Sequence, residues 1–195
     1  MGMKQSRPGS VEVVNVVGSG DIDTEIDLGI LHSDLGENNL VISEYDQDNL
    51  PAVKIRFEED GPLSMVYRSG KYVITGARSL EILSTIDGQL LELMKGLGII
   101  PKAYSSQMGV RNIVCVGDLN RSLDLQYLTV SLGLENTEYE PEQSPFLIYR
   151  VDDPKCVMTI ANSGRTMITG IRDRETAEKA FNHLKEKVRE TDTDQ

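Results

Sequence analysis

The stretch SGKYVITG at Ser69–Gly76 returns as SGRTMITG at Ser163–Gly170, 94 positions further along the chain. A basic residue follows two positions after each copy, at Arg78 and Arg172. One short echo can arise by chance, so the flanking sequence decides whether the chain is duplicated.

The flanks are duplicated as well. VVNVVGSGD at Val13–Asp21 returns as VRNIVCVGD at Val110–Asp118, with an offset of 97. VKIRF at Val53–Phe57 returns as LIYRV at Leu147–Val151, with an offset of 94. The change of offset places three extra residues in a connection of the first copy, where loops accept insertions. The chain is therefore a tandem repeat of two long copies, far beyond the period of a solenoid.

These repeats set the expected organisation of the chain. It comprises an N-terminal arm (1–10), a first repeat (11–100), a linker (101–109), a second repeat (110–188) and an acidic C-terminal tail (189–195).

The charge is strongly negative and unevenly distributed. The formal net charge is −11, and residues 11–100 hold 16 acidic against 6 basic residues, a net of −10. Generic nucleic-acid binders are usually basic. The acidity favours a surface adapted to a high-salt cytoplasm, where ions screen charge repulsion over a few ångströms.

Other features of the composition fit a cytoplasmic protein. No apolar run is long enough for a membrane-spanning helix, and the N-terminal residues lack the apolar core of a secretory signal. Cys115 and Cys156 lie in apolar strand-like runs of the second repeat, where buried free thiols are expected.

Each repeat predicts the order strand, helix, four strands, helix, an α+β fold. The alternating and helical patterns of the first repeat place these elements at 11–17, 26–35, 40–43, 52–57, 63–67, 71–75 and a long helix capped by Ser79. A helix from about Asp173 closes the second repeat, burying Ala177, Phe181, Leu184 and Val188. The long helix can cover one face of an antiparallel sheet, which leaves the other face bare.

The chemistry of that bare face is aliphatic, with amide and hydroxyl groups. Strand alternation places Lys71, Val73 and Thr75 on one face, and Tyr72 and Ile74 on the other. Asparagine and threonine donors above an aliphatic floor suit the acceptor-only A·T minor groove of DNA, and basic residues around them suit phosphates. A half-exposed sheet used for dimerisation or protein binding explains the same residues, so both interpretations stay open on residue chemistry alone.

The layout resembles the TATA-box-binding protein family, general transcription factors of archaea and eukaryotes. The resemblance rests on VVNVV and VRNIV, on the doubled SGK/R…ITG with its basic residue, and on YEPEQSPFLIYR at Tyr139–Arg150. It covers roughly residues 11–188 and implies a divergent, haloarchaeal-type member. The family implies a saddle-shaped, ten-stranded antiparallel sheet with helices on its convex face. In this family the underside of the sheet holds a bent minor groove that apolar wedges kink.

The resemblance implies a role for particular residues. The paired asparagines and threonines of the family match Asn15, Asn112, Thr75 and Thr169. The aliphatic contacts with the groove floor match Val17, Val73, Val114 and Met167. The phosphate-side positions match Arg56, Lys71, Arg78, Arg150, Arg165 and Arg172. The loop that meets transcription factor B contains Glu140 and Glu142.

The chain departs from the family at the wedges, which are two phenylalanines in each repeat. The first repeat has Leu50 and Tyr67 there, and both are large enough to act as wedges. The second repeat has Ser144 and Ala161, which are too small, so we expect one DNA kink to be weak or absent. Phe146 lies two residues beyond Ser144 and could substitute only if this loop is rearranged.

These features lead to one leading hypothesis and one rival. The leading hypothesis is an initiation factor that binds an A/T-rich promoter element and recruits transcription factor B and RNA polymerase, without a cofactor. The rival is a protein-interaction module or regulator that has lost productive DNA bending. A homodimer formed through the bare sheet in the absence of DNA is compatible with both.

No pattern indicates an enzyme or a metal site. Gly18-Ser19-Gly20 lacks the third glycine of a dinucleotide loop, and the acidic run from Asp21 to Asp27 lacks the glycine and terminal glutamate of a calcium loop. His32 and His183 have no partner at metal-ligand spacing, and no nucleophile motif is present.

Overall fold

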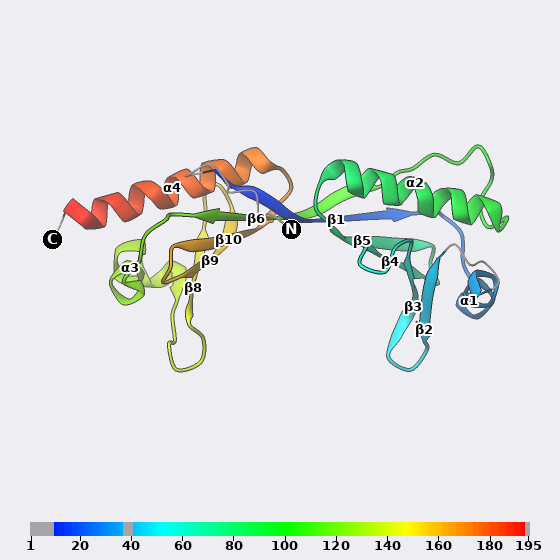
Figure 1. Ribbon diagram of the computed structural model, residues 1–195, viewed down its shortest axis with the longest axis horizontal. Coiled ribbons are helices and arrows are strands. Elements are labelled where there is room, and N and C mark those ends of the chain that lie inside the picture. The colour runs from blue at the N-terminus through cyan, green and yellow to red at the C-terminus, as the bar shows by residue number, and fades with distance from the viewer. Residues whose placement is uncertain (1–9, 37–40, 194–195) are drawn as a thin grey trace. The chain divides into compact units, whose positions relative to one another are not determined.

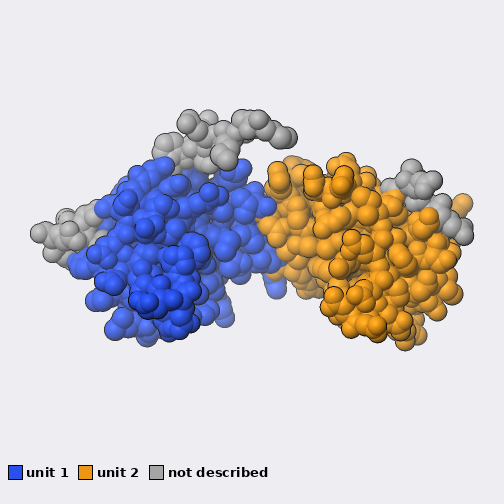
Figure 2. Space-filling model, turned by 60° about the horizontal axis from the view of Figure 1, so that its bottom comes forward, with its two compact units in different colours: residues 1–14, 112–195 blue, residues 15–111 orange. Residues whose placement is uncertain are grey.

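The computed structural model describes residues 10–36 and 41–193. These residues form two compact units, one holding residues 15–111 and the other holding residues up to 14 and from 112 on (Figure 2). We call them the first-repeat unit, orange in Figure 2, and the second-repeat unit, blue in Figure 2. Residues 1–9 of the expected arm, and 194–195 of the expected tail, lie outside the described residues.

The first-repeat unit follows the predicted order of elements. It contains β1 (Glu12–Asp21, whose first residues belong to the other unit), α1 (Leu28–Gly36), β2 (Ile42–Asp46), β3 (Leu50–Arg56), β4 (Leu63–Tyr67), β5 (Lys71–Ala77) and α2 (Leu80–Gly96) (Figure 1). Its strands pair antiparallel in the spatial order β2-β3-β4-β5-β1.

The second-repeat unit has the same order with one short addition. It contains β6 (Gly109–Asp118), α3 (Leu125–Leu132), a 3-10 turn (Leu134–Asn136), β7 (Thr137–Glu138), β8 (Phe146–Val151), β9 (Cys156–Ala161), β10 (Arg165–Ile171) and α4 (Arg174–Thr193). Its strands pair antiparallel in the order β6-β10-β9-β8-β7. The α+β prediction with two repeats of five antiparallel strands is confirmed.

In each unit one long helix covers one face of the sheet. Helix α2 packs on β5 and α4 packs on β10 (Figure 1). Ser79 caps α2 as predicted, because its Oγ accepts a hydrogen bond from the Ile82 N–H at 3.1 Å. Helix α4 continues through Thr193, into residues that the sequence assigns to a tail. No glycine or proline follows Ile171 in the sequence to stop the helix.

In each unit an aromatic ring packs against a glycine of the first strand, and the ring comes from a different element in each repeat. In the first-repeat unit Tyr72 of β5 is 1% exposed and donates a hydrogen bond from its hydroxyl to Asp87 Oδ1 of α2 at 2.6 Å. Burial, and then this bond to Asp87, raise the pKa of Tyr72 above its ordinary value. The ring lies against Gly20, where a Cβ would collide with it.

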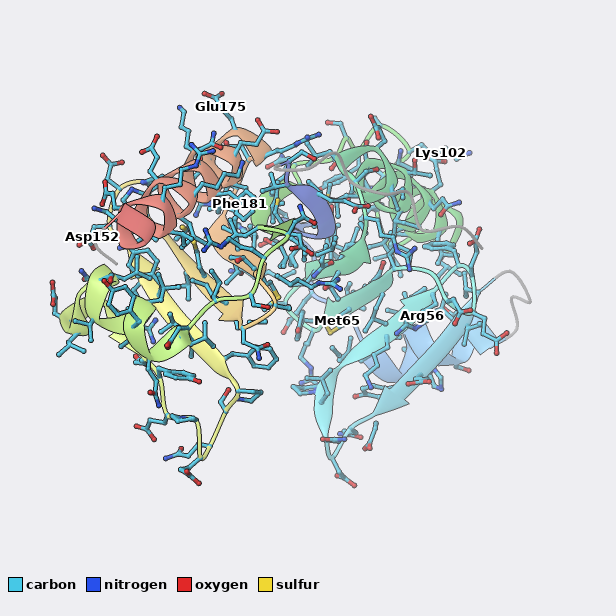
Figure 3. All side chains as sticks on the ribbon, turned by 60° about the vertical axis from the view of Figure 1, so that its left-hand side comes forward. Arg56, Met65, Lys102, Asp152, Glu175 and Phe181 are labelled. Carbon is cyan, nitrogen blue, oxygen red and sulfur yellow. The ribbon has the colours of Figure 1, made fainter. Side chains whose placement is uncertain are left out.

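In the second-repeat unit the ring comes from the helix instead. The positions equivalent to Tyr72 and Asp87, 94 residues later, are Thr166 and Phe181. Phe181 of α4 is 1% exposed and lies beneath the helix (Figure 3). A Cβ on Gly117 would approach its ring to 2.6 Å. The two repeats therefore keep a glycine-and-ring contact while changing the element that supplies the ring.

The duplicated aspartates that follow these glycines shape a turn. Asp21 Oδ1 accepts a hydrogen bond from the Asp23 N–H at 3.0 Å, and Asp118 Oδ1 accepts one from the Asn120 N–H at 2.7 Å. Asp23 and Asn120 both have positive φ, 51° and 54°. This side-chain turn is a structural reason for the repeated Gly-Asp. The described residues contain no group of three or more acidic, histidine or cysteine side chains able to hold a metal.

Cys115 and Cys156 are free thiols, 0% and 4% exposed, as the sequence predicts. Burial raises the pKa of each thiol to about 11. Among the helices in the described part of the chain, none has the length and apolar character needed to cross a membrane.

Candidate nucleic-acid interface

In each unit the sheet face turned away from the long helix is a candidate interface, and we call it the bare face. In β5 Tyr72 and Ile74 are buried, whereas Val73 and Thr75 are half-buried and Lys71 is exposed. The same alternation holds in β10, where Thr166 and Ile168 are buried and Met167 is 42% exposed. The predicted choice of faces is confirmed in both units.

Asn15 is fixed on the bare face by an irregularity in the strand pairing. The β1–β5 register shifts between Val16 and Gly18, and Gly76 adopts φ +87°. The Gly76 N–H donates a hydrogen bond to Asn15 Oδ1 at 2.8 Å. The side-chain oxygen is therefore occupied by the protein, and the Nδ2 amino group is the donor left to face outward.

Asn112 has the same arrangement in the second-repeat unit. The β6–β10 register shifts between Ile168 and Ile171, Gly170 adopts φ +82°, and its N–H donates to Asn112 Oδ1 at 2.9 Å. Asn112 Nδ2 also lies 3.2 Å from Thr169 Oγ1. Because an amide nitrogen carries two hydrogens, one remains for an outside acceptor. Sequence reasoning missed the hydrogen bond between the glycine N–H and the asparagine side chain, although the doubled ITG with its final glycine was the signal for it.

The aliphatic side chains that the resemblance predicts to contact the groove form a floor around the amides of Asn15 and Asn112. Val17, Val73 and Val114 are half-buried. Val73 lies opposite Met65 of β4, which is on the strand side away from α2 (Figure 3). Met167 lies opposite Thr159 of β9. Each unit thus offers an uncharged floor whose side chains are held partly out of solvent.

The predicted basic residues differ in what surrounds them. Lys71, Arg78, Arg165 and Arg172 are exposed. Arg56 donates from its Nη1 to the Gly61 carbonyl at 2.5 Å. Arg150 makes an ion pair with Glu138, with Nη2 to Oε1 at 2.9 Å.

Acidic residues accompany the basic ones in equivalent places of both repeats. Lys71 lies opposite Asp21 in the β1–β5 register, and Arg165 lies opposite Asp118 in the β6–β10 register. Lys71 and Arg165 are therefore each paired in the strand register with an aspartate, whose charge lowers the positive potential that a polyanion would meet at these two positions.

The positions of the wedges differ between the repeats. Leu50 begins β3 and Tyr67 ends β4, and both are half-buried. Ser144 precedes β8, and Ala161 ends β9. Phe146, the first residue of β8, is 44% exposed and lies opposite Ala161 in the strand register.

Glu140 and Glu142 lie in the loop between β7 and β8, and both are exposed. Glu140 Oε2 accepts a hydrogen bond from the Gln143 side-chain nitrogen, which ties this carboxylate to its own turn. The carboxylate of Glu142 lies two residues away on the same turn.

Comparison with known proteins gives consistent matches across both repeats. The family described as "Transcription factor TFIID (or TATA-binding protein, TBP)" matches residues 10–97 and 107–191. TATA-box-binding protein C of Halobacterium salinarum is 42% identical over 181 residues, covering 93% of this chain and 98% of that protein. TATA-box-binding protein of Archaeoglobus fulgidus is 36% identical over 179 residues, covering 92% and 94%.

A solved structure agrees with these sequence matches. The protein described as Methanococcus jannaschii TBP superposes with a TM-score of 0.78 at 32% identity, covering 93% of this chain and 99% of that one. The doubled motifs, the fold of each unit and these matches agree, and the predicted resemblance is confirmed. The chain belongs to the TATA-binding protein family, whose members are DNA-binding transcription factors and not enzymes.

Proposed function

We propose that this chain is a transcription initiation factor that binds an A/T-rich promoter element in the minor groove. The observation that carries the proposal is the matched orientation of Asn15 and Asn112, whose amide oxygens are occupied by Gly76 and Gly170. An A·T pair presents only acceptors in the minor groove. An amide turned so that its NH₂ group faces outward suits such acceptors, and the aliphatic floor suits sugar and base edges.

The remaining residues of the bare face take supporting roles. Thr75 and Thr169 lie near the amides, and Val17, Val73, Val114 and Met167 contact the groove floor. Arg56, Lys71, Arg78, Arg150, Arg165 and Arg172 contact phosphates, which positions the protein without reading sequence. In the first repeat, Leu50 and Tyr67 are the wedges.

The bound promoter complex then recruits transcription factor B and RNA polymerase. The exposed turn with Glu140 and Glu142 is the surface offered to transcription factor B, since carboxylates on a projecting loop suit a basic partner. The protein acts at the chromosome in the cytoplasm.

Replacing each asparagine with aspartate tests the proposal, because a carboxylate keeps the acceptor for the glycine N–H and removes the NH₂ donor. We expect Asn15→Asp and Asn112→Asp each to weaken binding to a TATA-containing duplex about tenfold or more, because each loses a base-edge contact. Fluorescence anisotropy measures the affinity. Asn182→Asp on the exposed side of α4 adds the same charge and is the control. Unchanged affinity in both site variants, with the fold intact, would exclude the proposed contact.

The second candidate function is a protein-interaction module with weakened DNA bending, and Ser144 and Ala161 favour it. A duplex labelled at both ends separates the two functions by energy transfer. The initiation factor shortens the end-to-end distance on binding, and the interaction module leaves it unchanged while still binding transcription factor B.

A further inference from the structure

Each repeat places an alanine opposite an aromatic ring on neighbouring strands, and the two repeats exchange the strands that carry them. Residues 52 and 146 are equivalent at the offset of 94, and so are residues 67 and 161. The first repeat has alanine at 52 and an aromatic ring at Tyr67. The second repeat has the ring at Phe146 and alanine at Ala161.

Strand register makes each pair a direct neighbour. Ala52 of β3 lies opposite Tyr67 of β4, and Phe146 of β8 lies opposite Ala161 of β9. Residues opposite one another in an antiparallel ladder share a face, with Cβ atoms about 5 Å apart. In both repeats a small alanine therefore leaves room beside a ring that rises from the neighbouring strand.

Phe146 belongs to the bare face. Along β8 the buried residues are Leu147, Tyr149 and Val151, so Phe146 points to the opposite side together with Ile148 and Arg150. Ile148 lies opposite Thr159, and Thr159 lies opposite Met167. The ring is therefore continuous with the aliphatic floor, and its exposed fraction of 44% shows that the described residues leave much of it uncovered.

A second exchange of ring positions between the repeats is found in the core, and it is an independent observation. Tyr72 of β5 fills the space at Gly20 in the first repeat, and Phe181 of α4 fills the equivalent space at Gly117 in the second. The contact has been retained while the ring has moved to a facing element. A ring can thus change its supporting position in this fold and still serve the same contact.

We propose that Phe146 is the base-step wedge of the second repeat, transposed from β9 to β8. The proposal rests on the proposed function, DNA binding through the bare face. It replaces the expectation that Ser144 and Ala161 leave one kink weak or absent, because the missing ring is supplied by the strand next to Ala161. Unstacking a base step needs an apolar group of this size inserted between the bases.

Moving the ring back across the strands tests the proposal. The measurement is affinity and end-to-end energy transfer on a doubly labelled TATA duplex, with wild type, Phe146→Ala, and the double variant Phe146→Ala with Ala161→Phe. We expect Phe146→Ala to bind about tenfold more weakly and to bend the duplex less. The double variant, which restores the arrangement of the first repeat, should recover both. Leu134→Ala, which truncates a side chain 69% exposed in the 3-10 turn, is the matched control and should leave both unchanged.

The outcomes separate the wedge from the proposed function. If the wild type binds and bends the duplex and Phe146→Ala does so equally well, the wedge role of Phe146 is overturned and the proposed function stands. A folded double variant that recovers nothing would overturn the transposition. Absence of wild-type binding would overturn both.

A fluorescent variant gives a second readout that does not depend on losing a contact. The chain has no tryptophan, so Phe146→Trp and, as control, Leu134→Trp each introduce a single indole that can be excited selectively over the tyrosines. Stacking of the indole introduced by Phe146→Trp on bases should quench its emission when the TATA duplex is added, whereas Leu134→Trp should change little. Unquenched emission from Phe146→Trp on bound DNA would overturn the wedge.

Discussion

Single glycines hold the two asparagines in position. Gly76 and Gly170 have φ of +87° and +82°, a region that costs an L-residue about 1–2 kcal/mol. A Cβ on Gly170 would meet no atom closer than 3.9 Å, so the backbone conformation and not crowding sets the requirement. The same glycine N–H fixes the amide of the asparagine, so the left-handed backbone conformation sets the orientation of that amide.

We therefore expect Gly170→Ala to lower the free energy of unfolding by about 1–2 kcal/mol. Urea unfolding followed by circular dichroism measures this. Gly88→Ala is the control, because Gly88 is exposed in α2 with no neighbour within 4 Å of an added Cβ, and alanine there should stabilise by about 0.5–1 kcal/mol. Equal stability changes at the two positions would contradict the role given to the left-handed conformation.

The buried thiols make stability fall at high pH. Burial raises the pKa of Cys115 and Cys156 from 9.0 to about 11, so the unfolded chain loses these protons before the folded chain does. The contribution of the two buried thiols to the free energy of unfolding is fully present below pH 9. It decreases from pH 9 towards 11, by about 1.4 kcal/mol per pH unit for each thiol.

Urea unfolding at pH 8, 9 and 10 measures this slope, and the double variant Cys115→Ala with Cys156→Ala is the control. The variant should be less stable at pH 8 but lose most of the slope between pH 9 and 10. A slope equally steep in the variant would assign the effect to other groups.

At the scale of elements, the start of α2 depends on a predicted cap. We expect Ser79→Ala to cost about 1 kcal/mol in unfolding free energy, because the Ile82 N–H loses its side-chain acceptor at the helix end. Ser84→Ala, at an exposed position within the helix, should be neutral or slightly stabilising. Equal losses from both substitutions in urea unfolding would show that the cap contributes nothing particular.

The sequence predicts the elements well because each has its own local pattern. Period-two alternation gives β4 with its observed bounds, and Ser79 followed by a helical apolar pattern gives the start of α2. The register shifts beside Asn15 and Asn112, and the placing of a ring at Phe146, could not be predicted in the same way, because they depend on which residues of neighbouring strands face one another. Adding the offset of 94 to both residues of the pair 52 and 67 gives residues 146 and 161. Comparing the two pairs would have revealed that the ring and the alanine change places.

At the scale of the whole molecule, the negative charge opposes the approach of DNA. The chain carries −11, and Lys71, Arg150 and Arg165 of the bare face have acidic neighbours, such as Glu138 beside Arg150. Salt screens the repulsion as well as the phosphate contacts. We expect carboxylates near the DNA to take up cations as the complex forms, which offsets the counterions that the DNA releases.

We therefore expect affinity for a TATA duplex to fall only weakly with salt, or to rise, between low and molar concentrations. Six phosphate contacts alone would give a logarithmic slope of about −5. Anisotropy titrations across this range measure the slope, and Glu138→Gln, which frees Arg150, should make it steeper. A steep monotonic loss in the wild type would argue against the compensation.

The central claim, that the bare face reads the minor groove, is tested most directly by exchanging base pairs within the TATA element. A hypoxanthine·cytosine pair offers the minor groove the acceptors of A·T but offers the major groove the pattern of G·C, and a G·C pair adds an amino group to the minor groove. We predict that the hypoxanthine duplex binds like the original and the G·C duplex binds about tenfold or more weakly. Equal loss of affinity on both substituted duplexes would contradict the account.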